Sequence, residues 1–289
     1  MPPLRTGLAS ADAQDDFLRA RRHLALARLR RRLRREPGEI DHILPFDDVV
    51  AALGRVQERD LGRQVVPVDS IVGTVDRTTG FDRNFRPTSP AVRRRWERIA
   101  AAVRRGEEMP PVDLYKVGEA YFVRDGHHRV SVARALGIDL IEARVKEVVT
   151  RVTVGADLRT GDLPLKSHER VFLERVPLPR DARGRVRPSD PWDFARLAEG
   201  VEAWAFRWIQ EHRQLLDRAE AARRWYEEEY VPVVTRLRDA GMLGEGTEAD
   251  AYLRVGAERY RLLRTHEWSD DVLARLRERD GGRGRRLSR

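Results

Sequence analysis

The chain has 289 residues, of which 41% are hydrophobic and 36% charged, and its formal net charge is +9. This length corresponds to one large or two small domains, and the apolar fraction is enough for at least one core. No stretch approaches 18 uncharged apolar residues, so we expect no membrane-spanning protein. We also expect no wholly disordered chain, because Trp, Phe, Leu and Val recur at core-like spacings.

The positive charge points first to nucleic acid or another polyanion. All but three of the 56 basic residues are arginine, the lysines being Lys116, Lys146 and Lys166. An arginine-biased genome produces such a ratio whatever the function, and the basic excess is spread along the chain. The charge therefore permits DNA binding without requiring it.

The chain contains no cysteine. Disulfides, thiolate catalysis and cysteine-ligated zinc or iron–sulfur sites are therefore excluded. The first residues lack a basic region followed by an apolar one, so no secretory signal is expected. We expect a cytoplasmic protein without a membrane partner.

The segment 1–64 is predicted to be a helical, basic extension. A first helix begins after three aspartates and ends at Glu36-Pro37-Gly38. Its predicted apolar stripe consists of Phe17, Leu18, Ala25, Leu26, Leu29 and Leu33. Arginines fill much of the rest, and the weak candidates for nucleic-acid contact are Arg28, Arg31, Arg32 and Arg35. A solvated face of an arginine-rich helix is the competing interpretation, which we favour.

The segment 65–148 has the pattern of a separate α+β domain. A strand begins at 65–68, a polar stretch covers 69–86, and a helix follows Pro90 and ends at Gly106. Two strands then form a hairpin, and a helix of small apolar residues is followed by Gly137 and a last strand. The expected fold class is thus α+β, with a helical extension before the mixed sheet and an all-α region after it.

The junction between the second hairpin strand and the next helix is the most informative feature. It reads Asp125-Gly126-His127-His128-Arg129. Glycine lets the backbone turn sharply and approach a ligand, and the N–H groups that follow are unpaired donors at a helix amino terminus. Arginine can grip phosphate oxygens through two hydrogen bonds. The pattern indicates a polyphosphate cradle, although an ordinary turn with exposed polar residues fits the spacing equally well.

The order of these elements resembles the ParB/sulfiredoxin superfamily. The resemblance rests on the helix ending at Gly106, the strand Met109-Pro110-Pro111-Val112-Asp113-Leu114-Tyr115, the Gly126–Arg129 motif, and the alanine-rich helix ending in Leu136-Gly137. It covers 65–148, less than a third of the chain. In ParB proteins the equivalent motif reads Gly-Glu-Arg-Arg and binds CTP; in sulfiredoxin it reads Gly-Cys-His-Arg and holds ATP. The free-serine kinases of the superfamily also carry a Gly-His-type motif.

The resemblance implies a nucleotide-binding domain in which Asp125, Gly126, His127, His128 and Arg129 surround the phosphates. The implied ligands are CTP, ATP or ADP, with Mg²⁺. This chain keeps the glycine and the arginine of the motif but has two histidines between them. Sulfiredoxin activity is excluded because that chemistry needs a cysteine.

Asp69 and Asp76 are the candidate catalytic residues. Members of the superfamily place substrate- or nucleotide-contacting residues after the first strand, and a carboxylate beside phosphates suits a general base or a Mg²⁺ partner. That both are ordinary turn residues is the favoured alternative. We predict no metal site, because the adjacent His127 and His128 at a helix start point in different directions and His168 is distant in sequence.

The segment 149–275 is predicted to be a helical domain and 276–289 a basic disordered tail. The strongest periodic signal lies between Phe194 and Ile209 and indicates a core-facing stripe. We find no helix-turn-helix, which disfavours sequence-specific DNA binding. The tail could touch phosphates without specificity.

Three functions follow from these observations. The first is a ParB-like nucleotide-binding protein, switched by nucleotide and associated non-specifically with DNA, as in chromosome partitioning; a homodimer is left open. The second is a small-molecule phosphotransferase resembling the free-serine kinases, and the third is a non-catalytic nucleotide sensor or scaffold. If the protein is an enzyme, we expect an NTP hydrolase of the CTPase type or a phosphotransferase.

Overall fold

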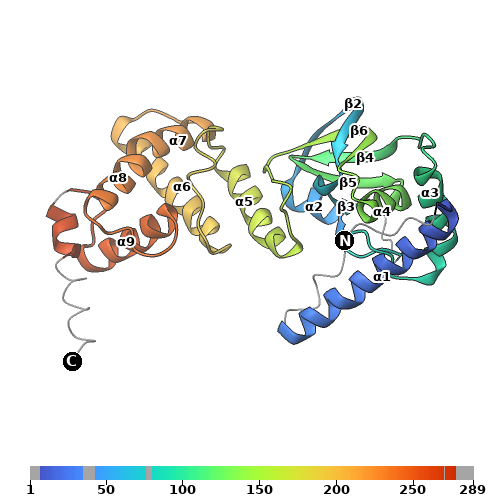
Figure 1. Ribbon diagram of the computed structural model, residues 1–289. Coiled ribbons are helices and arrows are strands. Elements are labelled where there is room, and N and C mark those ends of the chain that lie inside the picture. Colours follow the sequence, from blue (N-terminus) through green and yellow to red (C-terminus); the bar gives the residue numbers. More distant parts are fainter. Residues whose placement is uncertain (1–6, 35–42, 76–79, 270, 278–289) are drawn as a thin grey trace. The chain divides into compact units, whose positions relative to one another are not determined.

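A computed structural model describes residues 7–34, 43–75, 80–269 and 271–277. The chain divides into two compact units, Met1–Leu163 and Pro164–Arg289, called unit 1 and unit 2 below. Unit 1 combines helices with a sheet, and unit 2 is helical (Figure 1). The expected α+β class is confirmed at this level. No helix in the described ranges is both long and apolar enough to cross a membrane.

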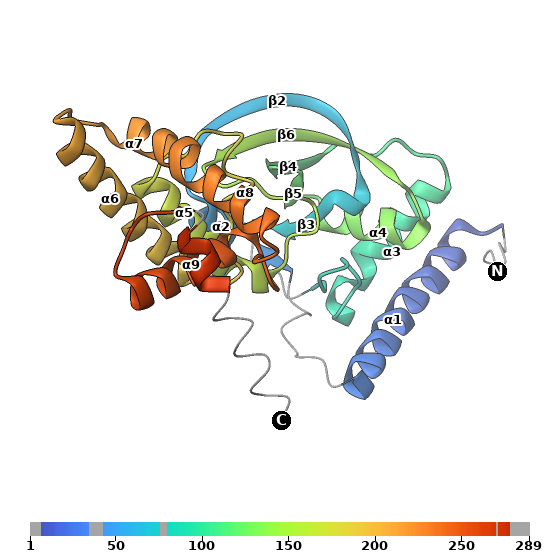
Figure 2. The same ribbon diagram turned by 90° about the vertical axis from the view of Figure 1, so that its left-hand side faces the viewer.

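Unit 1 is built on one six-stranded mixed sheet, whose longest strands are seen side by side in Figure 2. Its strands are β1 (Leu44–Pro45), β2 (Arg55–Pro67), β3 (Ile71–Thr74), β4 (Val112–Val117), β5 (Ala120–Asp125) and β6 (Leu140–Thr150). Their order across the sheet is β1-β3-β5-β4-β6-β2. The pairs β1–β3, β3–β5 and β4–β6 are parallel, whereas β4–β5 and β2–β6 are antiparallel. The carboxyl ends of β3 and β5 therefore lie at the same edge of the sheet.

Four longer helices accompany this sheet in the described part of unit 1. They are α1 (Ala9–Arg34), α2 (Phe46–Leu53), α3 (Arg93–Arg104) and α4 (His127–Leu136). Short 3₁₀ helices cover Val68–Ser70, Pro90–Val92 and Thr160–Asp162. The β4–β5 hairpin, α3, α4 and β6 agree with the sequence predictions, because each has a clear apolar pattern and a glycine or turn at its end.

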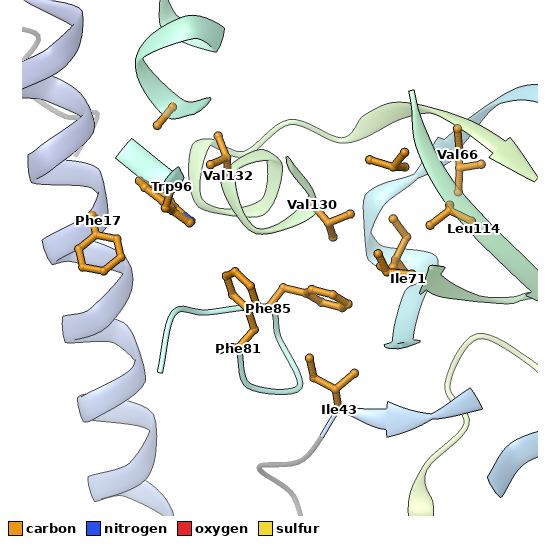
Figure 3. Packing of buried hydrophobic residues seen from close by; sticks show 14 of the residues in the cluster. Phe17, Ile43, Val66, Ile71, Phe81, Phe85, Trp96, Leu114, Val130 and Val132 are labelled. Carbon is orange, nitrogen blue, oxygen red and sulfur yellow. The ribbon is translucent and has the colours of Figure 1, made fainter. Parts of the chain in front are cut away.

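The core of unit 1 joins α1, α3, α4 and the loop after β3. Trp96 of α3 is fully buried and donates from Nε1 to Ser131 Oγ of α4 over 2.8 Å. Phe17 of α1 meets the Trp96 ring edge-on, with 5.5 Å between ring centroids. Figure 3 shows these rings together with Phe81 and Phe85 from the loop, packed beside the α4 valines. This packing holds α4 in place beside α1, α3 and the loop after β3.

The prediction that 1–64 is a helical extension is wrong at its end, although the short helix predicted over Asp47–Leu53 is present as α2. The strand β1 and most of β2 lie within 1–64, so the boundary at residue 64 cuts through β2. The β2 strand is exposed along most of its length, with only Val66 buried. Among the described residues it pairs with β6 alone, and register shifts occur between Arg55 and Gln57 and between Asp60 and Gly62. A strand at the sheet edge, largely in contact with water, lacks the alternation that reveals strands in a sequence.

The predicted apolar stripe of α1 is also wrong. Of its six residues only Phe17 is buried, and Leu18, Leu26, Leu29 and Leu33 are exposed. The face that meets unit 1 contains Ala13, Phe17, Ala20 and Leu24. Two aspartates, Asp12 and Asp16, are buried with it, and Asp16 accepts hydrogen bonds from Arg19 and Arg104. The leucine pattern predicted the wrong face of α1 to be buried, because much of the buried face consists of alanines and aspartates.

Unit 2 consists of consecutive helices. They are α5 (Leu163–Arg175), α6 (Asp193–His212), α7 (Arg218–Arg224), a π-helical segment (Trp225–Tyr230), α8 (Val231–Asp239), α9 (Glu248–Leu263) and a helix at 271–277. The predicted stripe of α6 is confirmed, with its buried residues being Phe194, Leu197, Ala198, Val201, Trp204 and Trp208. The π segment, which the sequence did not indicate, holds an aromatic cluster in which Trp225 donates to the Tyr252 hydroxyl.

The predicted boundary at residue 149 differs from the boundary between the units. The segment after β6 stays with unit 1, where Arg151 N donates to Gly54 O over 2.8 Å and Val152 N to Leu53 O over 3.1 Å. Val152, Val154 and Leu158 are buried. The sheet domain therefore extends about to the start of α5.

Candidate functional site

The predicted phosphate-binding motif lies where β5 passes into α4. Gly126 is the residue between them, and its carbonyl accepts the first bond of the helix from Val130 N over 3.0 Å. Because β3 runs parallel to β5, the loop after β3 leaves from the same edge, and Val75 N donates to Val123 O over 2.9 Å. The amino end of α4 therefore lies among the ends of two strands and the start of a loop (Figure 1).

Gly126 satisfies two separate requirements of this junction. Its backbone is left-handed, with φ 102°, which residues with a side chain rarely adopt. A Cβ placed there would lie 2.6 Å from Val112 Cγ1 and 3.1 Å from Arg129 Nη2. Glycine also has no side chain with which to cap the helix. As the N-cap residue it therefore makes no side-chain cap hydrogen bond, and the N–H groups at a helix amino terminus are the donors that an anion site uses.

His127 is held by the end of β3. Its Nε2 lies 2.6 Å from Thr74 Oγ1, and this hydroxyl also lies 3.3 Å from Val123 O. The ring of Phe85 is near, with 6.5 Å between centroids. Thr74 is buried, so its hydrogen bond fixes the orientation of the imidazole.

His128 has the most perturbed environment of the motif. Its Nδ1 is buried and has no hydrogen-bond partner among the described residues. Burial, and to a lesser extent the charges of Arg95 and His127, together lower the pKa of His128 to about 4. The ring packs edge-on against Phe81, with 5.1 Å between centroids. At neutral pH His128 is therefore an uncharged imidazole with an unused polar atom, close enough to Arg95 to feel its charge.

Arg129 faces the protein. Its Nη1 donates to Pro110 O and Pro111 O at 2.5 and 2.8 Å, and its Nη2 donates to Asp125 Oδ2 at 2.6 Å. The side chain is 14% exposed, whereas that of Asp125 is 61% exposed. These bonds tie the start of β4 to α4, which is a positioning role. A phosphate could engage this guanidinium only by exchanging bonds that the protein now makes.

Asp69, one of the two candidate catalytic aspartates, is not brought together with this motif. Asp69 is exposed at the opposite end of α4, where the neighbouring Val68 N donates to Asp139 O over 2.8 Å. It lines a cavity of about 470 Å³ beside α1 and the carboxyl end of α4. The ten residues of α4 span about 15 Å, which separates Asp69 from Gly126. Asp76 lies outside the described residues.

The other predicted contacts are dispersed. Arg28 and Arg32 are exposed on α1, Arg31 belongs to the same helix, and Arg35 lies outside the described residues. His168 belongs to unit 2, where its ring contacts Trp192. Within the described ranges, no group of three or more His, Asp or Glu residues is placed to hold a metal ion.

Sequence reasoning missed two residues of the site, Thr74 and Arg95. Thr74 is the last residue of β3, and the parallel pairing with β5, which the sequence did not reveal, brings it to His127. Arg95 precedes Trp96, whose bond to Ser131 fixes α3 against α4. The pattern that could have pointed to Arg95 in the sequence is an arginine directly before a core tryptophan.

No family model, curated protein or solved structure matches the chain.

Proposed function

We propose that unit 1 binds a nucleotide, whose phosphate groups lie at the amino end of α4. The observation that carries this proposal is Gly126, where both backbone conformation and the closeness of Val112 require glycine. The result is an uncapped helix start, whose partial positive charge favours an anion. Unlike a surface turn, this junction is constrained by the core beneath it.

The side chains around the junction support an anion as the ligand. His127 and His128 follow Gly126 directly, and the positive charge of Arg95 acts at His128. In this proposal the helix N–H groups, the two imidazoles and Arg95 contact phosphate. Arg129 keeps the cradle in shape through its bonds to Pro110, Pro111 and Asp125.

The choice of a nucleotide over a single phosphate group rests on the resemblance to the ParB/sulfiredoxin superfamily. CTP, ATP and ADP with Mg²⁺ are the ligands to test first. Asp125, the carboxylate next to the motif, is already paired with Arg129, and Asp69 lies at the other end of α4. We therefore propose that the primary role is nucleotide binding that switches the protein's association with DNA. The same experiment tests whether the protein also hydrolyses the nucleotide or transfers its phosphoryl group.

The experiment is a calorimetric panel of ATP, ADP, CTP and GTP with Mg²⁺ on the full chain, followed by mass spectrometry for turnover. The informative variant is Arg95→Gln, and the matched control is Arg98→Gln, because both arginines are exposed on α3. We expect Arg95→Gln to weaken binding about tenfold, as loss of a charge-assisted hydrogen bond does. Arg98→Gln should bind like the unmodified chain, and both variants should keep its Tm.

Two results would overturn the proposal. One is the absence of binding for all four nucleotides at millimolar concentration, and the other is equal weakening by both substitutions. Duplex DNA added at increasing salt, with and without the bound nucleotide, tests the DNA association that the resemblance implies. A shift that depends on nucleotide supports a switch, and formation of diphosphate or of a phosphorylated acceptor supports an enzyme.

A further inference from the structure

The helix α1 has two apolar faces. Ala13, Phe17, Ala20 and Leu24 are buried against the rest of unit 1. A second set, called the leucine stripe here, is 42%, 52%, 55% and 77% exposed and consists of Leu18, Leu26, Leu29 and Leu33. At about 100° per residue, the mean directions of the two sets differ by roughly 170°. The leucine stripe thus faces directly away from the rest of unit 1.

The last part of α1 extends beyond the packed core. After Leu24, none of the described side chains up to Arg34 is buried. These ten residues correspond to about 15 Å of helix. Figure 1 shows this end of α1 leaving the sheet and the helices of unit 1. Three of the four leucines of the stripe, Leu26, Leu29 and Leu33, belong to this extending end.

The charge around the leucine stripe has one sign. No acidic residue occurs between Asp16 and Glu36, and nine arginines lie in that interval. Asp12 and Asp16 are buried, which leaves Asp15 as the exposed carboxylate in the described part of α1. The surface that surrounds the leucines is therefore strongly basic.

We propose that the leucine stripe lies on the surface of an anionic lipid bilayer. The leucines face away from the folded core, with Arg22 between Leu18 and Leu26 on the same side of the helix. Such a side fits a flat surface, because arginines among and beside the leucines can reach anionic headgroups while their stems cover apolar area. An interfacial helix need not span the bilayer, so the absence of a spanning helix among the described residues does not conflict with this role.

Two other occupants fit less well. Duplex DNA attracts arginines but offers the leucines no apolar surface along its backbone. A second copy of the chain would bring two strongly basic helices together with one exposed carboxylate each, Asp15, to offset them. An anionic bilayer offers an apolar interior to the leucines and negatively charged headgroups to the arginines.

The test is co-sedimentation of the full chain with 100-nm vesicles of phosphatidylcholine containing 30% phosphatidylglycerol, and with pure phosphatidylcholine vesicles. The stripe variant is Leu26→Gln, Leu29→Gln and Leu33→Gln together. The matched control is Val56→Gln, Val65→Gln and Leu140→Gln, three apolar residues that are also more than half exposed. We expect binding to the anionic vesicles alone, retained by the control and weakened at least tenfold in the stripe variant.

A separate arginine variant, Arg22→Gln with Arg30→Gln, should weaken binding and reduce its dependence on salt. Because all these residues are exposed or half-buried, Tm should change little, which separates a lost contact from misfolding. The proposal is wrong if the chain binds neither vesicle, if pure phosphatidylcholine binds equally well, or if the stripe variant binds normally. It is also wrong if the stripe substitutions act on duplex-DNA binding or on self-association measured by analytical ultracentrifugation.

Discussion

Gly126 illustrates how one residue meets two independent constraints. Alanine there would face a left-handed backbone and a contact of 2.6 Å with Val112 Cγ1, whereas a Cβ added at Gly137, with φ 69°, would meet nothing within 4 Å. We expect Gly126→Ala to cost about 3 kcal/mol, from backbone strain and overpacking, and Gly137→Ala about 1 kcal/mol from strain alone. Urea unfolding of both variants measures the difference, and equal losses would contradict a close approach at Gly126.

His128 should make stability depend on pH. Its pKa in the folded chain is lowered to about 4, below its ordinary value of 6.5. Between these values the unfolded chain binds a proton that the folded chain does not, so the free energy of unfolding falls as pH drops from 6.5 towards 4. One such group contributes at most about 1.4 kcal/mol per pH unit. Urea titrations at several pH values should show this slope, and it should flatten in His128→Gln.

A bound phosphate should reverse that shift. Negative charge beside the imidazole favours its protonated form, so the pKa of His128 should rise in the complex. Nucleotide affinity should then increase as pH falls, and binding should take up protons. NMR titration of the histidine with and without nucleotide measures this directly. An unchanged His128 pKa in the complex would place the phosphate elsewhere.

Arg129 should behave as a positioning residue. Arg129→Gln removes donors from Pro110 O, Pro111 O and Asp125, and we expect a loss of about 2 kcal/mol in the free energy of unfolding. Lysine should restore less than half, because a point charge cannot serve three separated acceptors. Arg95→Gln, by contrast, should alter affinity at constant Tm. Undiminished stability in Arg129→Gln, with lost binding, would instead make Arg129 a direct phosphate contact.

At the scale of elements, a buried ion pair between α1 and α3 contributes to the docking of α1. Asp16, whose side chain is 1% exposed, accepts from Arg104 of α3 at 2.7 Å, and Arg104 is itself 13% exposed. Removing one partner of such a pair leaves a poorly hydrated charge, so Asp16→Ala should cost about 3 kcal/mol. Arg19→Ala, on the exposed side of Asp16, should cost under about 1 kcal/mol.

Hydrogen exchange is the suitable measurement for this pair of variants. Asp16→Ala should speed exchange of the α1 amides up to Leu24 while leaving the β4–β5 hairpin protected. Equal protection of α1 in both variants would mean that Phe17 and its apolar neighbours suffice to hold the helix.

Elements with their own apolar pattern could be predicted from the sequence, and those stabilised mainly by partners could not. The helices α3, α4 and α6 agree with prediction because each has a buried stripe and a clear end. In α1 a second apolar face misled the pattern, and β2 has almost no buried side chains to reveal it. At the site, Gly126 was found from its junction, but the inward direction of Arg129 depends on carbonyls of a distant segment.

At the scale of the whole molecule, the two units have separate cores. One contains Trp96, Phe85 and Val130, and the other contains Leu237, Val255 and Leu273. We expect two calorimetric transitions, because each core unfolds as its own cooperative unit. Asp16→Ala should lower the transition of unit 1 alone. Leu237→Ala, which truncates a fully buried side chain, should lower the free energy of unfolding of unit 2 alone, by about 3 kcal/mol. A single transition shifted by both substitutions would contradict separate cores.

The long edge strand β2 has a consequence for behaviour in a crowded solution. A free strand edge can recruit strands from other molecules and so start aggregation. Here the edge carries Arg55, Glu58, Arg59, Asp60 and Arg63, and its two register shifts interrupt a regular ladder. Charge and irregularity of this kind discourage an incoming strand. The polar sequence that made β2 hard to predict is thus a feature that discourages the sheet from pairing with a strand of another molecule.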